Sequence, residues 1–261
     1  ESAERQARRR DDPLPAAADD AERRARKSLA DAKGDPERYR EALSDAILDV
    51  RAPRGFRDAL LPELRQLNDK LIFVAEPTKR FKPWTIAKGE NLTLIANRAN
   101  KQNSTNVTAA LLMRLNRLTS TVLRQGQVLN VPAQKMSVRI HKDDFRLFAL
   151  LGGEIVLDYG IGIGKNDGTP EGRFTIKGKT KNPDWTTPDG RVLKYGHPEH
   201  IIGSRWMGFD NAQGRTTYGI HGTVDEASIG KSESAGCIRM RKVDVEALFE
   251  LIPEGCSVEL K

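Results

Sequence analysis

The stretch His221-Gly222-Thr223 … Ser228-Ile229-Gly230 … Ser234-Ala235-Gly236-Cys237-Ile238-Arg239-Met240 contains one of the four histidines and one of the two cysteines of the chain. A free cysteine is only slightly ionised at neutral pH, so an imidazole that takes the thiol proton makes it a far better nucleophile. Gly236 permits a tight turn that would aim N–H groups near Cys237 at an oxyanion, and Gly222 would leave its carbonyl free to orient the histidine ring. A second interpretation stays open from these residues alone, in which Cys237 is a small buried core residue.

The order and spacing of this stretch resemble the signature of the L,D-transpeptidases with a YkuD-type catalytic domain, in which H-G is followed about fifteen residues later by S-H-G-C-[IV]-R. Here 15 residues, 222 to 236, separate His221 from Cys237. One position departs from the signature, because Ala235 stands where the family usually has histidine. The resemblance implies that Cys237 is the nucleophile, that His221 is the base and that the carbonyl of Gly222 orients it. Ser234 would support the loop, and the amides of Gly236 and Cys237 would be the oxyanion donors. The implied substrate contacts are Arg239, Tyr218, Trp206 and Met207, although Arg239 could instead tie the loop to the scaffold.

The resemblance extends over residues 137–261. Thr169-Pro170-Glu171-Gly172-Arg173-Phe174 is similar to a T-P-x-G-x-F turn early in these domains, and Asn182-Pro183-Asp184-Trp185 is similar to their N-P-x-W segment. Apolar residues alternate from Val138 onward, and Gly152-Gly153 predicts a two-residue hairpin. Helical spacing recurs only from Val245 to Ile252, before a last strand. We therefore expect a mainly-β sandwich with one late helix, which is also what the family implies.

Residues 83–133 form a second recognisable region. Trp84-Thr85-Ile86-Ala87-Lys88-Gly89-Glu90-Asn91-Leu92 resembles the opening of a LysM module, and Gly126-Gln127-Val128-Leu129-Asn130-Val131-Pro132 resembles its closing strand. The alternation at both ends and two amphipathic segments between them predict a β-α-α-β unit. The resemblance implies a glycan groove between two loops, formed by Gly89, Glu90, Asn91, Leu92, Thr93, Asn116, Arg117 and Leu118. A small spacer without sugar affinity is the other interpretation.

The remaining N-terminal part divides in two. Residues 1–20 are rich in Arg, Asp and Ala without apolar periodicity, which predicts a disordered lead. Residues 21–76 predict short helices, of which one starts at Asp35-Pro36 as N-cap and first helical residue. A second apolar stripe runs from Phe56 through Leu64 to Leu71, and Pro62 within it indicates a kink or a late start. The fold class as a whole is α+β and multidomain.

The composition of the chain limits the classes of molecule that it can be expected to bind. The net charge of +7 favours anionic partners, but aromatic residues make up only 6% and no aromatic-interleaved basic stripe exists, which argues against nucleic acid. No apolar run is long enough to span a membrane. Gly160-Ile161-Gly162-Ile163-Gly164 lacks the helix and the Lys-Ser/Thr of a phosphate loop. His197 and His200 flank a proline in a non-helical segment, so we expect no metal and no cofactor.

These features predict an enzyme that attacks a peptidoglycan stem tetrapeptide with Cys237, releases the terminal D-alanine and transfers the acyl group to an amine. Two alternatives remain: an L,D-carboxypeptidase, in which water is the acceptor, and a catalytically weak peptidoglycan-binding protein, for which Ala235 is the main argument. The expected partners are stem peptides and the N-acetylglucosamine-containing glycan. The substrate that the resemblance implies predicts export to the cell envelope, and we expect a monomer.

Overall fold

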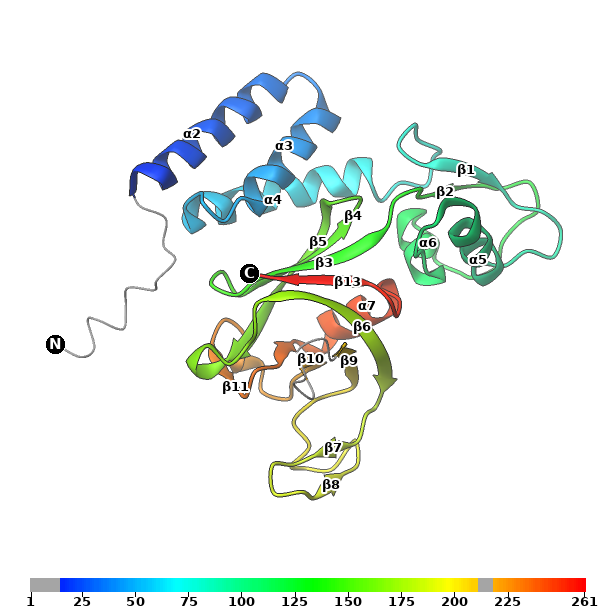
Figure 1. Cartoon of the computed structure of the whole chain (residues 1–261). Helices are drawn as coiled ribbons and strands as arrows, with labels where there is room; N and C mark the ends of the chain where they lie inside the picture. The colour runs from blue at the N-terminus through cyan, green and yellow to red at the C-terminus, as the bar shows by residue number, and fades with distance from the viewer. Residues whose placement is uncertain (1–14, 211–217) are drawn as a thin grey trace. The chain divides into compact units, whose positions relative to one another are not determined.

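The computed structural model describes residues 15–210 and 218–261 (Figure 1). The chain divides between Ile72 and Phe73 into two compact units. Within the described ranges, no helix combines the length and the apolar character that crossing a membrane requires.

The N-terminal unit consists of the helices α2 (Pro15–Ala32), α3 (Pro36–Leu48) and α4 (Arg54–Leu71). The predicted cap of α3 is confirmed, because Asp35 accepts hydrogen bonds from the amides of Glu37 and Arg38 at 3.0 and 3.3 Å. Residues 15–20 are helical rather than part of a disordered lead, since α2 already begins at Pro15. The first fourteen residues of the predicted lead lie outside the described residues.

The late start that Pro62 indicated is wrong, because α4 begins at Arg54. Helix α4 runs through this proline without interruption. Its buried face consists of Arg57, Leu61, Leu64 and Asn68, one residue away from most positions of the predicted stripe. A proline ring removes one N–H donor and crowds the preceding turn, but the packing of the helix decides the outcome here.

The LysM region has the predicted β-α-α-β order. Strands β1 (Lys82–Thr85) and β2 (Val128–Val131) pair in antiparallel register, and helices α5 (Leu92–Asn103) and α6 (Ala109–Leu115) lie between them in the sequence. The buried apolar side chains of both helices and of β2 form one small core: Leu92, Ile95, Ala96, Ala99, Leu111, Leu112, Leu115, Leu129 and Val131.

Polar contacts join this region to the C-terminal domain. The side chain of Asn106 brackets the backbone of Met136, accepting its N–H at 2.6 Å and donating to its carbonyl at 2.8 Å. The hydroxyl of Thr108 accepts the N–H of Leu111 at 3.0 Å and donates to the carbonyl of Glu250 at 3.0 Å. Thr108 thus caps α6 and contacts the last turn of another helix with the same oxygen.

The C-terminal domain is mostly β-structure. Its elements in chain order are β3 (Met136–His141), β4 (Arg146–Leu151), β5 (Glu154–Gly164), β6 (Gly172–Lys181), β7 (Trp185–Thr186), β8 (Val192–Leu193), β9 (Arg205–Phe209), β10 (Gly219–Gly222), β11 (Ser232–Ser234), β12 (Ile238–Met240), α7 (Lys242–Leu251) and β13 (Ser257–Leu260). In the described residues, nine of these strands are ordered β11-β5-β12-β10-β9-β6-β13-β3-β4, and β4 pairs again with β5. The strand order therefore closes on itself at β4 and β5, and the domain is mainly β, as the sequence predicts.

The predicted local features of this domain are present. Gly152 and Gly153 connect β4 to β5 and both have positive φ, which suits a two-residue hairpin. Helix α7 is the predicted late helix and buries Val245, Leu248 and Phe249. It follows β12 directly and packs on β9 and β10, while the small β7–β8 hairpin projects from one end of the domain (Figure 1).

Candidate active site

Two neighbouring strands bring the histidine and the cysteine together. Strands β10 and β12 are parallel, with Ile220 opposite Ile238 and His221 opposite Arg239. Side chains of residues that are paired directly across two neighbouring strands share one face, so His221 and Arg239 project from the same face of the sheet. Cys237 immediately precedes β12, two residues before Arg239, and the backbone N–H of Gly219 lies within hydrogen-bond reach of its sulfur. The predicted base therefore lies on β10, and the predicted nucleophile lies directly before the adjacent strand β12.

The ring of His221 is buried and held by backbone. Its Nδ1 lies 2.6 Å from the carbonyl oxygen of Gly222. A ring that donates its Nδ1–H to this oxygen has an unprotonated Nε2, which can accept a proton. Trp206, directly opposite on β9, stacks on the ring with centroids 5.8 Å apart and planes 24° apart.

Burial lowers the pKa of His221 to about 4. The carbonyls of Gly222 and Ile202 act in the opposite direction, whereas the charges of Arg239 and His200 add to the lowering. Burial also raises the pKa of the Cys237 thiol, although the Gly219 amide and the Arg239 charge oppose that rise. At neutral pH the thiol of Cys237 and the imidazole of His221 are consequently both uncharged at rest.

Ser234 holds the loop around the nucleophile. Its hydroxyl accepts the N–H of Gly236 at 3.0 Å and donates to the carbonyl of Cys237 at 2.7 Å. Gly236 has φ +136°, a conformation that L side chains rarely adopt, and a Cβ there would collide with the ring of Tyr218. The bond to Ser234 uses the amide of Gly236, one of the two expected oxyanion donors.

Ala235 is the position that departs from the signature. It is exposed, whereas its neighbours Ser234 and Gly236 are buried. The alanine therefore leaves the hydrogen bonds of Ser234 intact.

The four expected substrate contacts divide into two groups. Tyr218 packs against Gly236, Trp206 covers His221, and Arg239 forms no hydrogen bond or ion pair within the described ranges. Met207 does not belong with them, because it is completely buried and points away from the face that carries Trp206. The sequence motif could not distinguish the two residues, since adjacent positions of one strand face opposite sides of the sheet.

Sequence analysis missed residues that support the site from a distance. Gly203 packs so closely on Gly222 that a Cβ would lie 2.9 Å from its carbonyl carbon. His200 is buried, bonds through Nε2 to the carbonyl of Pro183 at 2.8 Å, and acts electrostatically on His221. Thr169, in the T-P-x-G-x-F segment, is buried and hydrogen-bonded to the carbonyl of Gly236. The sequence marked this segment as similar to the family but indicated no role for its threonine.

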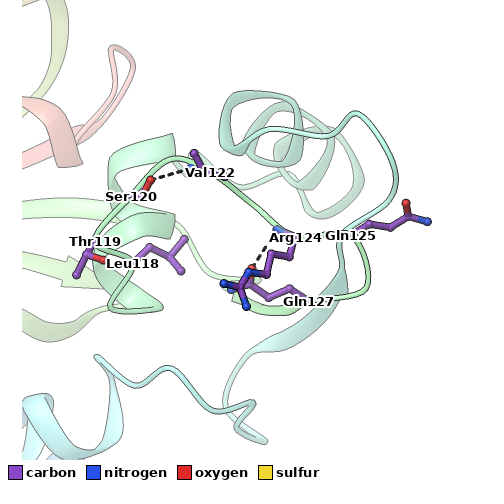
Figure 2. Close-up of a pocket in the computed structure, with 7 residues that line it drawn as sticks. All are labelled: Leu118, Thr119, Ser120, Val122, Arg124, Gln125 and Gln127. Atoms are coloured by element: carbon purple, nitrogen blue, oxygen red, sulfur yellow. Dashed lines mark hydrogen bonds between the residues drawn. The ribbon is translucent and has the colours of Figure 1, made fainter.

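The LysM region contains a pocket of about 510 Å³, and Figure 2 shows the residues around it. The loop between α6 and β2 lines it with Leu118, Thr119, Ser120, Val122, Arg124, Gln125 and Gln127. Hydrogen bonds from the amides of Val122 to Ser120 and of Arg124 to Gln127 hold the loop in shape, as the dashed lines show.

Most of the expected glycan-binding residues do not line this pocket; only Leu118 does. Leu92 is a buried core residue, and Asn91 caps α5. Glu90 accepts the N–H groups of Ala87 and Trp84 and pairs with Arg98, bonds that lower its pKa. These side chains use their hydrogen-bonding capacity within the module.

The second expected glycan loop is also engaged in the fold. Asn116 is buried and binds the backbone of Leu112 and Asn130 through three hydrogen bonds. Arg117 has positive φ and donates to the carbonyl of Phe73. The remaining two residues, Gly89 and Thr93, stand outside the pocket lining, and Gly89 adopts the positive φ of a turn.

Comparison with known proteins identifies both regions. Residues 135–260 match the YkuD family, the L,D-transpeptidase catalytic domain, and residues 85–132 match the LysM domain. The chain is 40% identical over 124 residues to the putative L,D-transpeptidase YqjB of Bacillus subtilis, covering 46% of this chain and 68% of that protein. It is 31% identical over 160 residues to the probable L,D-transpeptidase YcfS of Escherichia coli, covering 53% of this chain and 50% of that protein.

A solved structure is similar as well. The catalytic domain of the Enterococcus faecium L,D-transpeptidase aligns with 49% of this chain and 98% of its own, at 21% identity and a TM-score of 0.38. The chain spans about two thirds of the length of YqjB and half of the length of YcfS. By its two matched domains and its identity to YqjB, the chain belongs to the L,D-transpeptidase family, with a YkuD-type catalytic domain preceded by a LysM domain.

Proposed function

We propose that this chain is a peptidoglycan L,D-transpeptidase in which Cys237 is the nucleophile and His221 the general base. The arrangement of β10 and β12 supports this assignment most strongly, because His221 lies on β10, Cys237 directly precedes the neighbouring strand β12, and Nδ1 of His221 is anchored on Gly222. Nε2 then takes the thiol proton as the sulfur attacks the carbonyl of a stem tetrapeptide. The Gly222 carbonyl replaces the carboxylate that orients the base in serine-type triads.

The proton transfer is coupled to the attack. Both groups are uncharged at rest, since burial raises the pKa of Cys237 and lowers that of His221. The S–C bond forms while the S–H proton moves to Nε2, and a tetrahedral oxyanion results. When it collapses, the C–N bond breaks, and the imidazolium returns its proton to the departing amine of D-alanine. An amine acceptor then attacks the thioester carbonyl: the new C–N bond forms, the C–S bond breaks, and the imidazole passes the amine proton to the departing sulfur, which restores the thiol.

The amide of Cys237 is our proposed oxyanion donor. The amide of Gly236 was an equal candidate from the sequence, but it donates to Ser234 in this structure. We assign Ser234 the role of holding the turn, since it contacts the backbone on both sides of the nucleophile. Donors that are fixed before the reaction stabilise the developing charge without reorganisation.

Arg239 is proposed to receive a substrate carboxylate. Its guanidinium projects from the same face as His221 and is not tied to the scaffold by any hydrogen bond or ion pair of the described chain. A half-buried guanidinium with open donors suits a carboxylate, which it can hold with two hydrogen bonds. Tyr218 and Trp206 flank the same site and are proposed to contact the stem peptide.

The LysM region is proposed to bind the glycan through the pocket lined by residues 118–127. Its exposed Arg124, Gln125 and Thr119 can offer hydrogen bonds to sugar hydroxyls, with Leu118 and Val122 as apolar surface. Holding the chain on glycan raises the local concentration of stem peptides. The proposed substrate lies in the cell envelope, so we infer that the protein acts there, after export.

The test is a reaction with a purified disaccharide-tetrapeptide. The proposal predicts D-alanine release and a cross-linked dimer, both of which are lost in Cys237→Ala. Tripeptide without dimer would indicate a carboxypeptidase. Folded wild-type protein that releases no D-alanine but still binds peptidoglycan would contradict the enzyme assignment for this substrate.

A further inference from the structure

The segment 165–171 lies 66 or more residues before the nucleophile in sequence, yet it contacts the nucleophile's loop directly. Thr169 is 1% exposed. Its Oγ1 accepts the N–H of Gly164 at 2.8 Å and lies 2.9 Å from the carbonyl oxygen of Gly236. A backbone N–H can only donate, so the single hydroxyl proton of Thr169 goes to Gly236. The direction of both hydrogen bonds is therefore fixed.

The carbonyl of Gly236 belongs to the peptide unit that contains the amide of Cys237. A trans peptide is planar, and its C=O and N–H point in opposite directions. Fixing the oxygen of Gly236 consequently fixes the direction of the Cys237 N–H. A hydrogen bond to the carbonyl also polarises the peptide unit and makes its N–H a stronger donor. Ser234 binds the amide of Gly236 and the carbonyl of Cys237, which lie on either side of this peptide unit. Thr169 binds the carbonyl of the Gly236–Cys237 peptide unit itself.

Close packing leaves this unit little freedom. A Cβ on Gly164 would lie 2.7 Å from Cα of Gly236, and a Cβ on Gly236 would lie 2.7 Å from the carbonyl oxygen of Gly168. These two glycines allow the segment and the nucleophile's loop to touch backbone to backbone. Thr169 is placed at the point of contact.

A buried ammonium group holds the segment in place. Lys142 is 5% exposed, and its Nζ lies 2.8 Å from Asp167, 2.9 Å from Glu171 and 3.2 Å from the carbonyl of Thr169. Burial by itself lowers the pKa of this lysine, but the two carboxylates outweigh it and the net pKa is raised. The ammonium therefore stays charged and ties residues on both sides of Thr169 to the end of β3.

We propose that Thr169 is a positioning residue for acyl transfer, whose hydroxyl sets the orientation of the Gly236–Cys237 peptide and thereby of the oxyanion donor. This inference rests on the proposed function of the Cys237 amide. It assigns a role to the T-P-x-G-x-F segment, which the proposed mechanism does not otherwise use.

The test compares two reactions of the same cysteine. Alkylation by iodoacetamide needs a reactive thiol but no oxyanion donor, whereas acylation by a carbapenem or by the tetrapeptide passes through an oxyanion. Thr169→Val should lower kcat for D-alanine release and the carbapenem acylation rate by roughly 10- to 100-fold. KM and the alkylation rate should change by less than about threefold. Thr169→Ser retains the hydroxyl and should restore acylation.

Thr108→Val is the matched control. Thr108 also accepts one backbone N–H, at 3.0 Å, and donates toward backbone carbonyls, those of Glu250 at 3.0 Å and Leu251 at 3.3 Å, but it lies in the LysM region. It should lose stability comparably and keep the acylation rate of the wild type. Thr169→Ala removes the same hydroxyl and provides the test if the valine variant does not fold.

Each outcome is decisive. Acylation that falls while alkylation stays supports the proposal, and equal loss of both, or wild-type acylation in the folded Val or Ala variant, overturns it. Wild-type protein that is acylated by the carbapenem but releases no D-alanine would contradict the proposed peptide substrate, and the Thr169 comparison would still be read from the carbapenem. Wild-type protein that reacts with neither acyl donor would overturn both.

Discussion

The stretch around Cys237 and the LysM region were both recognisable from short motifs, but the structure treats their polar residues differently. Around Cys237, the guanidinium of Arg239 has no partner in the described chain, and backbone orients His221. In the LysM region, Glu90, Asn91 and Asn116 are engaged with their own backbone. A side chain whose donors and acceptors are all used cannot bind a ligand without losing those bonds. Motif residues therefore divide into those that build the fold and those that remain available for a ligand.

The largest effect is expected at the base. His221→Asn should lower kcat for D-alanine release by roughly 10²–10⁴-fold, because the proposed mechanism gives the thiol proton to His221 alone. The Asn amide can still donate to Gly222, so the fold should persist. Kinetics with the tetrapeptide and circular dichroism check both points. Retention of more than a tenth of the activity would show that His221 is not the base.

The same histidine should make stability depend on pH. Its pKa is about 4 in the folded chain, against 6.5 for an ordinary histidine. Between these values the unfolded chain binds a proton that the folded chain does not, so the free energy of unfolding falls as pH falls from 6.5 to 4. The full loss is about 3 kcal/mol.

Urea unfolding at pH 7 and pH 4, for the wild type and for His221→Asn, isolates this contribution. The carboxyl groups titrate in both proteins, so their contributions to the free energy of unfolding cancel in the difference. Parallel pH dependence of the two proteins would mean that the imidazole is not held uncharged by burial.

A pair of LysM variants sharpens the comparison between fold-building and available residues. Asn116→Ala should destabilise the protein by about 1–3 kcal/mol, since it leaves the buried N–H of Asn130 without its acceptor. Arg124→Ala should leave stability within about 0.5 kcal/mol and weaken glycan binding, because Arg124 is exposed at the pocket. Unfolding curves and pull-down on peptidoglycan measure both. If Asn116→Ala weakened glycan binding without loss of stability, and Arg124→Ala left binding unchanged, the glycan site would lie at Asn116 instead.

The smallest effect is expected at Ala235. Ala235→His restores the usual residue of the signature at an exposed position. Stability should change by less than about 0.5 kcal/mol, and kcat/KM for the tetrapeptide by less than about threefold. A tenfold gain would show that the alanine limits the reaction and would support a catalytically weak protein.

Features that depend on neighbours in sequence could be predicted. The cap at Asp35, the hairpin at Gly152-Gly153 and the apolar face of α7 each follow from spacing within about ten residues. The pairing of His221 with the cysteine loop was predicted because one motif contains both residues.

Features that depend on residues far apart in the sequence could not be predicted. Thr169 meets Gly236 across 67 positions, and Asn116 meets Asn130 across 14, so no local pattern indicates either contact. Met207 and Trp206 are adjacent in sequence, and only the register of β9 shows which one faces the site. Pro62 likewise indicated a kink or a late start, whereas α4 already begins at Arg54.

The most direct test of the account is to trap the acyl-enzyme. The protein is mixed with disaccharide-tetrapeptide, quenched in acid within one turnover, digested and mapped by mass spectrometry. The account predicts a disaccharide-tripeptide adduct on the peptide that contains Cys237. Cys256 is completely buried and serves as an internal control that should stay unmodified. D-alanine release without any adduct on Cys237, or an adduct on another residue, would contradict the assignment of Cys237 as the nucleophile.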